Sequence, residues 1–209
     1  MSVNIADNKE ILESSLWNFA VSIYQKNGVS AACLFLQESC DVDVPLLFCA
    51  GFLVVNGKCF DPAILSALQK QTSPWQRDVV QSLRVVRQKL KSGSYPVQID
   101  KGEALRLSVK AAELSAEKIQ LNMMEDATAQ VPPSDIPPNL SNLTAVLTMV
   151  VDAQSKIALT SEHMKNIQLI ANAILGREAE RAERHSTCDA NVSMVCEYSP
   201  LLVMGRHQI

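Results

Sequence analysis

The stretch LRLSVKAAELSAEKIQLNM, residues 105–123, decides the fold because its apolar side chains recur at helical spacing. Successive apolar residues are separated by 4, 3, 4, 3 and 4 positions. This pattern predicts a long amphipathic helix with a period close to that of a coiled coil. An apolar face of this length needs a partner, so the segment favours helix-on-helix packing. The stripe consists of Leu105, Val109, Ala112, Ala116, Ile119 and Met123.

A second long stripe follows a proline-rich connector. Residues 131–138 contain four prolines, and this density excludes a helix there. Apolar residues then recur from Leu143 to Ile174, and Gly176 is well suited to end the helix. Two long helices joined by a short connector predict an antiparallel hairpin over about residues 100–176.

Shorter helices are expected over residues 8–91, where start and stop signals are frequent. Asp43-Val44-Pro45 and Asp61-Pro62 each combine a capping side chain with a proline that fits the first turn. Ser73-Pro74, with Gln76 as the far side of a capping box, predicts another start and a helix to about Lys91. We therefore predict one all-α domain over 1–176, with the short helices packed on the long hairpin. Residues 177–209 lose the periodicity and are expected to form a flexible tail.

The composition is that of a globular domain. Of 209 residues, 47% are hydrophobic and 20% charged, which excludes a disordered chain as a whole. The formal charge of −3 argues against a protein that coats nucleic acid through bulk positive charge. The first thirteen residues do not resemble a secretory signal, and the longest apolar run, residues 44–55, is too short to span a membrane. A cytoplasmic protein with no membrane association is therefore expected.

The cysteines and histidines do not form a recognisable metal or catalytic motif. The six cysteines contain no Cys-x-x-Cys pair, and the three histidines are scattered. Cys33 and Cys49 lie in apolar surroundings, where a free cysteine is usually a small buried residue. Nucleotide-binding loops and Glu-x-x-His pairs are also missing. We therefore expect no metal and no cofactor, and the sequence favours a protein that is not an enzyme.

Basic residues concentrate in one segment. Residues 61–110 hold nine basic and four acidic residues, whereas the flanking segments are acidic. On a helix from Trp75 to Lys91 the bases would form a ridge able to bind phosphates or carboxylates. The candidate surface comprises Trp75, Arg77, Arg84, Arg87 and Lys91.

Three interpretations of this ridge stay open. In the first, it binds another protein, and the chain is a non-catalytic interaction or adaptor protein. In the second, it binds RNA, although no RNA-binding motif is present. In the third, it is a structural face paired with acids of the C-terminal hairpin, such as Glu113, Glu117, Glu125 and Asp126.

A different class of function would use the interior of the N-terminal cluster. Trp17 and Tyr24 are seven residues apart and share a helical face, and Gln37 is a polar residue near an apolar run. These three could line a pocket in a small helical enzyme or ligand-binding protein. Trp17 and Tyr24 are equally suited to anchor a hydrophobic core.

Several clusters resemble a family of small proteobacterial proteins known only as a domain of unknown function. The resemblance covers roughly residues 10–175, with departures at Pro45 and over residues 50–52. It implies a helical bacterial protein and supplies no activity. Genes of this family often lie beside that of a ribosome-associated ATPase of the ATP-binding-cassette type, which implies a partner near translation. The matching clusters are Leu16-Trp17-x-Phe19-Ala20 with Tyr24, Gly28-Val29, Cys33-Leu34-x-Leu36-Gln37, Asp43-Val44, Leu46-Leu47-Phe48-Cys49, Trp75, Leu83-Arg84-x-x-Arg87-x-x-Leu90-Lys91 and Glu113-Leu114-x-Ala116-Glu117.

Overall fold

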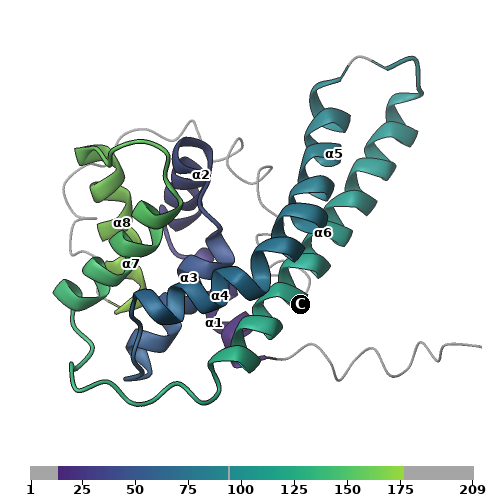
Figure 1. Ribbon diagram of the computed structural model, residues 1–209. Helices are drawn as coiled ribbons and strands as arrows, with labels where there is room; N and C mark the ends of the chain where they lie inside the picture. The colour runs from purple at the N-terminus through teal and green to yellow at the C-terminus, as the bar shows by residue number, and fades with distance from the viewer. Residues whose placement is uncertain (1–13, 94, 177–209) are drawn as a thin grey trace, which may run out of the picture.

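The computed structural model describes residues 14–93 and 95–176, and over these ranges the protein is all-α, with no strand (Figure 1). The tail predicted for residues 177–209 lies outside the described residues. The helices are α1 (Ser15–Tyr24), α2 (Val29–Cys40), α3 (Val44–Val55), α4 (Pro62–Trp75), the π-helix η2 (Gln76–Val80), α5 (Gln81–Ser92), α6 (Ile99–Thr128), α7 (Leu140–Gln154) and α8 (Ser161–Ile174).

Most of the helices that are preceded by Ser, Thr, Asp or Asn begin with a hydrogen bond from a backbone amide to that side chain. The side chain of Ser14 accepts a hydrogen bond from the Trp17 amide at 3.0 Å, and Asp61 accepts one from Ile64 at 2.8 Å. These bonds satisfy amides that have no partner inside the helix. At α8 the cap is reciprocal, since Thr160 and His163 each bind the backbone amide of the other.

The hydrophobic core lies around α3. This helix is apolar on all sides, and Leu47, Phe48 and Cys49 have no exposed surface. It packs against α1, α6, α7 and α8, so its burial from several directions explains why its sequence shows no polar face. Gly51 brings α3 close to α8, because a Cβ atom there would lie 2.7 Å from Cδ1 of Ile174.

The prediction of a long antiparallel hairpin over residues 100–176 is wrong, because α6 packs mainly against α5 and not against the helices that follow it. The second long helix is divided into α7 and α8 by residues 155–160, and these two helices pack against each other and against the core. The Ser155 hydroxyl accepts from the Ile157 amide at 3.2 Å, and Thr160 then caps α8. The chain therefore turns where the apolar stripe is interrupted by polar residues.

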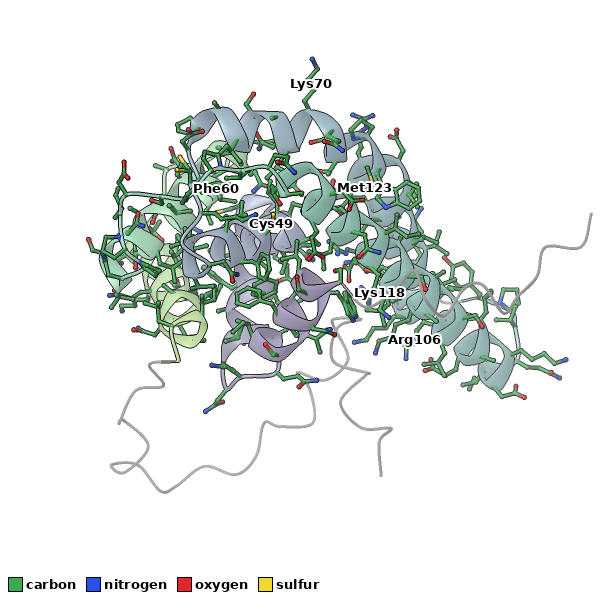
Figure 2. The ribbon with its side chains drawn as sticks, turned by 90° about the horizontal axis from the view of Figure 1, so that it is seen from below. Cys49, Phe60, Lys70, Arg106, Lys118 and Met123 are labelled. Carbon is green, nitrogen blue, oxygen red and sulfur yellow. The ribbon has the colours of Figure 1, made fainter. Side chains whose placement is uncertain are left out.

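The main partner of α6 is α5, and together they form an arm (Figure 1). We use this name for residues 81–93 and 95–112, which hold α5, the connector and the first half of α6. Figure 1 shows the arm projecting away from the body, and Figure 2 places Arg106 on it, far from Cys49 in the core. The second half of α6 continues into the body and contacts α1, α3 and α4.

The helix start predicted at Ser73-Pro74 is also wrong. Pro74 lies inside α4, and α4, η2 and α5 follow one another without interruption from Pro62 to Ser92. Because proline has no amide hydrogen, it removes one helical hydrogen bond, and here a π-turn follows directly. The wider turn rotates α5 about the helix axis relative to α4. This rotation determines which side chains of α5 face α6.

Candidate functional site

The buried face of α6 is largely polar in the middle of the helix and includes the core residues Leu121 and Met124 further on. Three of its fully or almost fully buried residues are Glu113, Glu117 and Gln120. The apolar stripe predicted for this face is largely outside, since Leu105 is 54% and Ile119 40% exposed. Only Ala116 of that stripe is buried. The prediction failed because α5 presents arginines to α6, and buried cations require acidic partners more than they require apolar ones.

Arg84 and Arg87 on α5 pair with Glu113 and Glu117 on α6. Arg84 donates from Nε to Oε1 of Glu113 at 2.9 Å and from Nη2 to Oε1 of Glu117 at 2.8 Å. Arg87 donates to both carboxylate oxygens of Glu113, from Nε to Oε2 and from Nη2 to Oε1. Glu113 thus accepts three guanidinium hydrogen bonds, an arrangement that fixes the register of the two helices.

The network extends from α6 into the body. Gln120 donates from Nε2 to Oδ2 of Asp43 at 2.6 Å. The backbone amide of Asp43 in turn donates to Oε1 of Gln154 at the end of α7, at 2.8 Å. We call the six residues that connect α3, α5 and α6 the polar network; they are Asp43, Arg84, Arg87, Glu113, Glu117 and Gln120, all buried.

The charges of the polar network do not balance when every group is ionised. Two guanidinium groups face three carboxylates, which leaves one surplus negative charge. Burial, the largest effect, raises the pKa of Asp43 to about 6 and that of Glu117 to about 7. The nearby Glu113 and Asp43 carboxylates raise the pKa of Glu117 further, whereas Arg84 opposes the shift.

Two oxygen atoms of the network have no hydrogen-bond partner among the described residues. They are Oε2 of Glu117 and Oε1 of Gln120, both buried. Oε1 of Gln120 and the ionised form of Glu117 can only accept, so the fully ionised network lacks donors rather than acceptors. A proton on Glu117 would supply one of the missing donors.

The prediction that basic side chains of Trp75–Lys91 form an exposed ridge is wrong for Arg84 and Arg87. Arg84 is 8% and Arg87 2% exposed, and both are paired inside the protein. The alternative in which α5 pairs with acids of the following helix holds for Glu113 and Glu117. It does not hold for Glu125, which accepts from the Ser15 hydroxyl and the Leu16 amide.

The other three residues of the candidate surface are separated from one another. Trp75 is half-buried and donates its indole N–H to the Ala116 carbonyl at 3.0 Å. Arg77 is exposed and pairs with the adjacent Asp78. Lys91 is exposed near the far end of α5. The π-turn explains the separation, because it changes the rotation between Arg77 and Arg84, which uninterrupted α-helical spacing would place on one face.

Trp17 and Tyr24 fill the core. Both are buried, and the Tyr24 ring meets the Phe48 ring edge to face with centroids 6.3 Å apart. Lys118 lies with its Nζ 4.7 Å from the centroid of the Trp17 ring. Gln37 is half-buried, and the cavities described below are lined by other residues. None of these cavities is lined by Trp17, Tyr24 or Gln37, and the burial of the two aromatic rings agrees with a role as core anchors.

Most of the described cysteines are buried. Cys33, Cys40 and Cys49 are buried and Cys59 is half-buried, all as free thiols, and Cys188 and Cys196 lie outside the described residues. Burial raises the pKa of the Cys33 thiol and raises that of Cys49 to about 12, so neither is a nucleophile at neutral pH. No cluster of three metal-ligating side chains occurs within residues 14–93 and 95–176.

The described surface has at least three cavities. A shallow apolar one lies along α7 and α8 and a smaller one at the tip of the arm. The third, of about 460 Å³, lies beside the polar network, where Asp43 and Gln154 meet the helix formed by α4, η2 and α5. Polar side chains dominate its lining, including Gln69, Ser73, Gln76 and Gln81.

Sequence reasoning offered the pairing with Glu113 and Glu117 as one of three interpretations, but it missed the parts played by Asp43 and Gln120 and this cavity. Asp43 looked like a simple helix cap, and Gln120 carried no motif. The available signal was the spacing, because two arginines three apart and two glutamates four apart each form one helical face. Helices with such faces can pair directly, but the sequence does not specify which two helices are neighbours.

The fold and this site define an all-α protein organised around a buried ionic network. Residues 15–124, more than half of the chain, match a family described as "Protein of unknown function (DUF2390)", and the chain belongs to that family. The matched region includes all six residues of the polar network and ends before α7. No curated protein and no solved structure matches the chain. None of the described helices is long and apolar enough to cross a membrane.

Proposed function

We propose that this protein is a non-catalytic interaction protein and that the arm is the surface it presents to another protein. The observation that carries this proposal is exposed apolar surface. Seven of the twelve large apolar side chains exposed on the described part of the chain lie on the arm. They are Val85, Val86, Tyr95, Val97, Ile99, Leu105 and Leu107.

The charge of the arm favours an acidic partner. Between residues 88 and 112 there are five basic and two acidic residues. Exposed apolar side chains surrounded by charged ones are typical of surfaces that bind protein. The two arginines that made RNA attractive as a ligand are buried, so we favour a protein partner. The family resemblance supports a partner associated with translation.

A capture experiment with matched variants tests the proposal. Tagged wild-type protein, Val86→Asp, Leu107→Asp and the control Ile157→Asp would be used to capture proteins from cells in which the protein occurs. Val86 and Leu107 are 46% and 50% exposed on the arm, and Ile157 is 52% exposed between α7 and α8. Because a charge in the centre of an apolar interface costs about 2 kcal/mol or more, we expect capture to fall at least about tenfold for both arm variants.

The control separates the arm from exposed apolar residues in general. Ile157→Asp should capture the partner as the wild type does. If all four proteins capture the same set equally, or if no protein depends on the arm, the proposal is wrong. Circular dichroism of each variant would verify that helicity is unchanged.

A further inference from the structure

We propose that the cavity beside Asp43 is a binding site for a small organic cation with several N–H donors, such as a guanidinium compound. The site lies in the body, at the N-terminal end of α3, and does not depend on the function proposed for the arm. Asp43 is one of its lining residues, and it is 8% exposed and therefore nine-tenths buried. Its walls come from α4, η2, α5 and the end of α7.

The charge behind the cavity favours a cation. Asp43 accepts a hydrogen bond from Gln120 and interacts electrostatically with Arg84 and Glu117. This network carries one surplus negative charge when ionised, and the interior screens it poorly. A cation bound at Asp43 compensates the surplus charge, whereas a neutral ligand of the same shape does not.

The lining favours a ligand with N–H groups. Gln69, Gln76, Gln81 and Gln154 can each present a carbonyl oxygen, and Ser73 adds a hydroxyl. Gln154 is already oriented, because its Oε1 accepts from Asp43 and its Nε2 donates to the Val150 carbonyl. A guanidinium group brings five N–H donors in one plane, so it can satisfy Asp43 and the amides together.

One basic side chain lines the cavity and would compete with the ligand. Arg77 stands at the rim, is 68% exposed and directs its guanidinium to Asp78. Its position in η2 fits the frequent occurrence of π-turns at functional sites. The cavity volume of about 460 Å³ exceeds the space that one water or metal ion needs, which supports an organic ligand.

Calorimetric titration with two probes of equal shape tests the site. We would titrate the full chain with n-butylguanidinium and with the neutral n-butylurea. Butylguanidinium should bind saturably, and butylurea should bind at least tenfold more weakly. Asp43→Asn should weaken butylguanidinium binding at least tenfold, whereas Asp135→Asn, a change at an exposed acid in the connector before α7, should leave it unchanged.

A second variant, which should bind butylguanidinium more tightly, distinguishes loss of the site from misfolding. Arg77→Ala removes the competing cation, so it should tighten butylguanidinium binding severalfold, an outcome that a folding defect cannot produce. Equal binding of the two probes, wild-type affinity in Asp43→Asn, or no saturable binding at millimolar butylguanidinium would each overturn the proposal. These outcomes leave the arm proposal unaffected, because no arm residue is changed.

Discussion

Arg87 shows that the burial and the role of a basic side chain depend on the helix that packs against it. In the sequence it is one base among many on a charged helix, but in the fold it is 2% exposed and bound to both oxygens of Glu113. A buried ion pair is costly to form, and it is more costly to break by removing one partner. The role of Arg87 is therefore to join α5 to α6.

Replacing Arg87 with methionine should lower the free energy of unfolding by about 3 kcal/mol, because Glu113 loses two of its three guanidinium hydrogen bonds in a buried site. The control is Lys89→Met, two residues away on the exposed side of α5, which should change stability by less than about 0.5 kcal/mol. Urea unfolding followed by circular dichroism measures both. Equal stability of the two variants would contradict the structural role of Arg87.

The pH dependence of stability should report on Glu117. Its pKa rises from 4.5 in the unfolded chain to about 7 in the fold, so between these values the folded protein retains a proton that the unfolded chain has released. The free energy of unfolding should therefore fall as pH rises from about 5 to 8, by about 3 kcal/mol for Glu117. Asp43, whose pKa is raised to about 6, contributes in the same direction.

Glu117→Gln removes this titration and keeps an oxygen that can accept from Arg84. Urea unfolding at pH 5, 6, 7 and 8 should show a flatter decline for this variant than for the wild type. A decline of the same slope in both proteins would show that Glu117 does not hold the proton.

Among the helices, α3 and α8 are held in contact by the absence of a side chain at Gly51. Gly51→Ala places a Cβ atom 2.7 Å from Cδ1 of Ile174, so α8 must move or Ile174 must change rotamer. We expect this variant to lose about 1–3 kcal/mol, in spite of the better helix propensity of alanine.

The double variant Gly51→Ala/Ile174→Val should regain part of that loss, because valine lacks the Cδ1 atom. On its own Ile174→Val should be destabilising by about 1 kcal/mol. Thermal unfolding of the four proteins gives the coupling between the two sites. Additive effects would mean that the two helices are not in tight contact at Gly51.

Local sequence signals predict where helices begin better than they predict which face of a helix is buried. The starts of α3 and α4 were predicted correctly because Asp43-Val44-Pro45 and Asp61-Pro62 are local signals. The stripe on α6 was misleading because half of this helix lies on the arm, where apolar residues such as Leu105 are exposed. The helical period shows which residues share one face of the helix. It does not show whether that face is buried or exposed.

For the whole molecule, the all-α class follows from composition and period, but the pairing of helices does not. The choice between α5 and the 143–176 segment as partner of α6 depends on Arg84 and Arg87 meeting Glu113 and Glu117, a long-range match that no local rule contains. The π-turn after Pro74 is a second reason, since a change in helix rotation redirects every residue that follows. The candidate cavity needs α3, α4 and α7 together and was therefore beyond sequence reasoning.

The length of α6 has a mechanical consequence. This helix has 30 residues and no break, so it is a single rod about 45 Å long. Ile99 is its first residue, and Gln120, which donates a hydrogen bond to Asp43, lies in its second half. One continuous helix thus joins the arm to the body. A partner that tilted the outer part of this helix would therefore also move Gln120 relative to the Asp43 carboxylate.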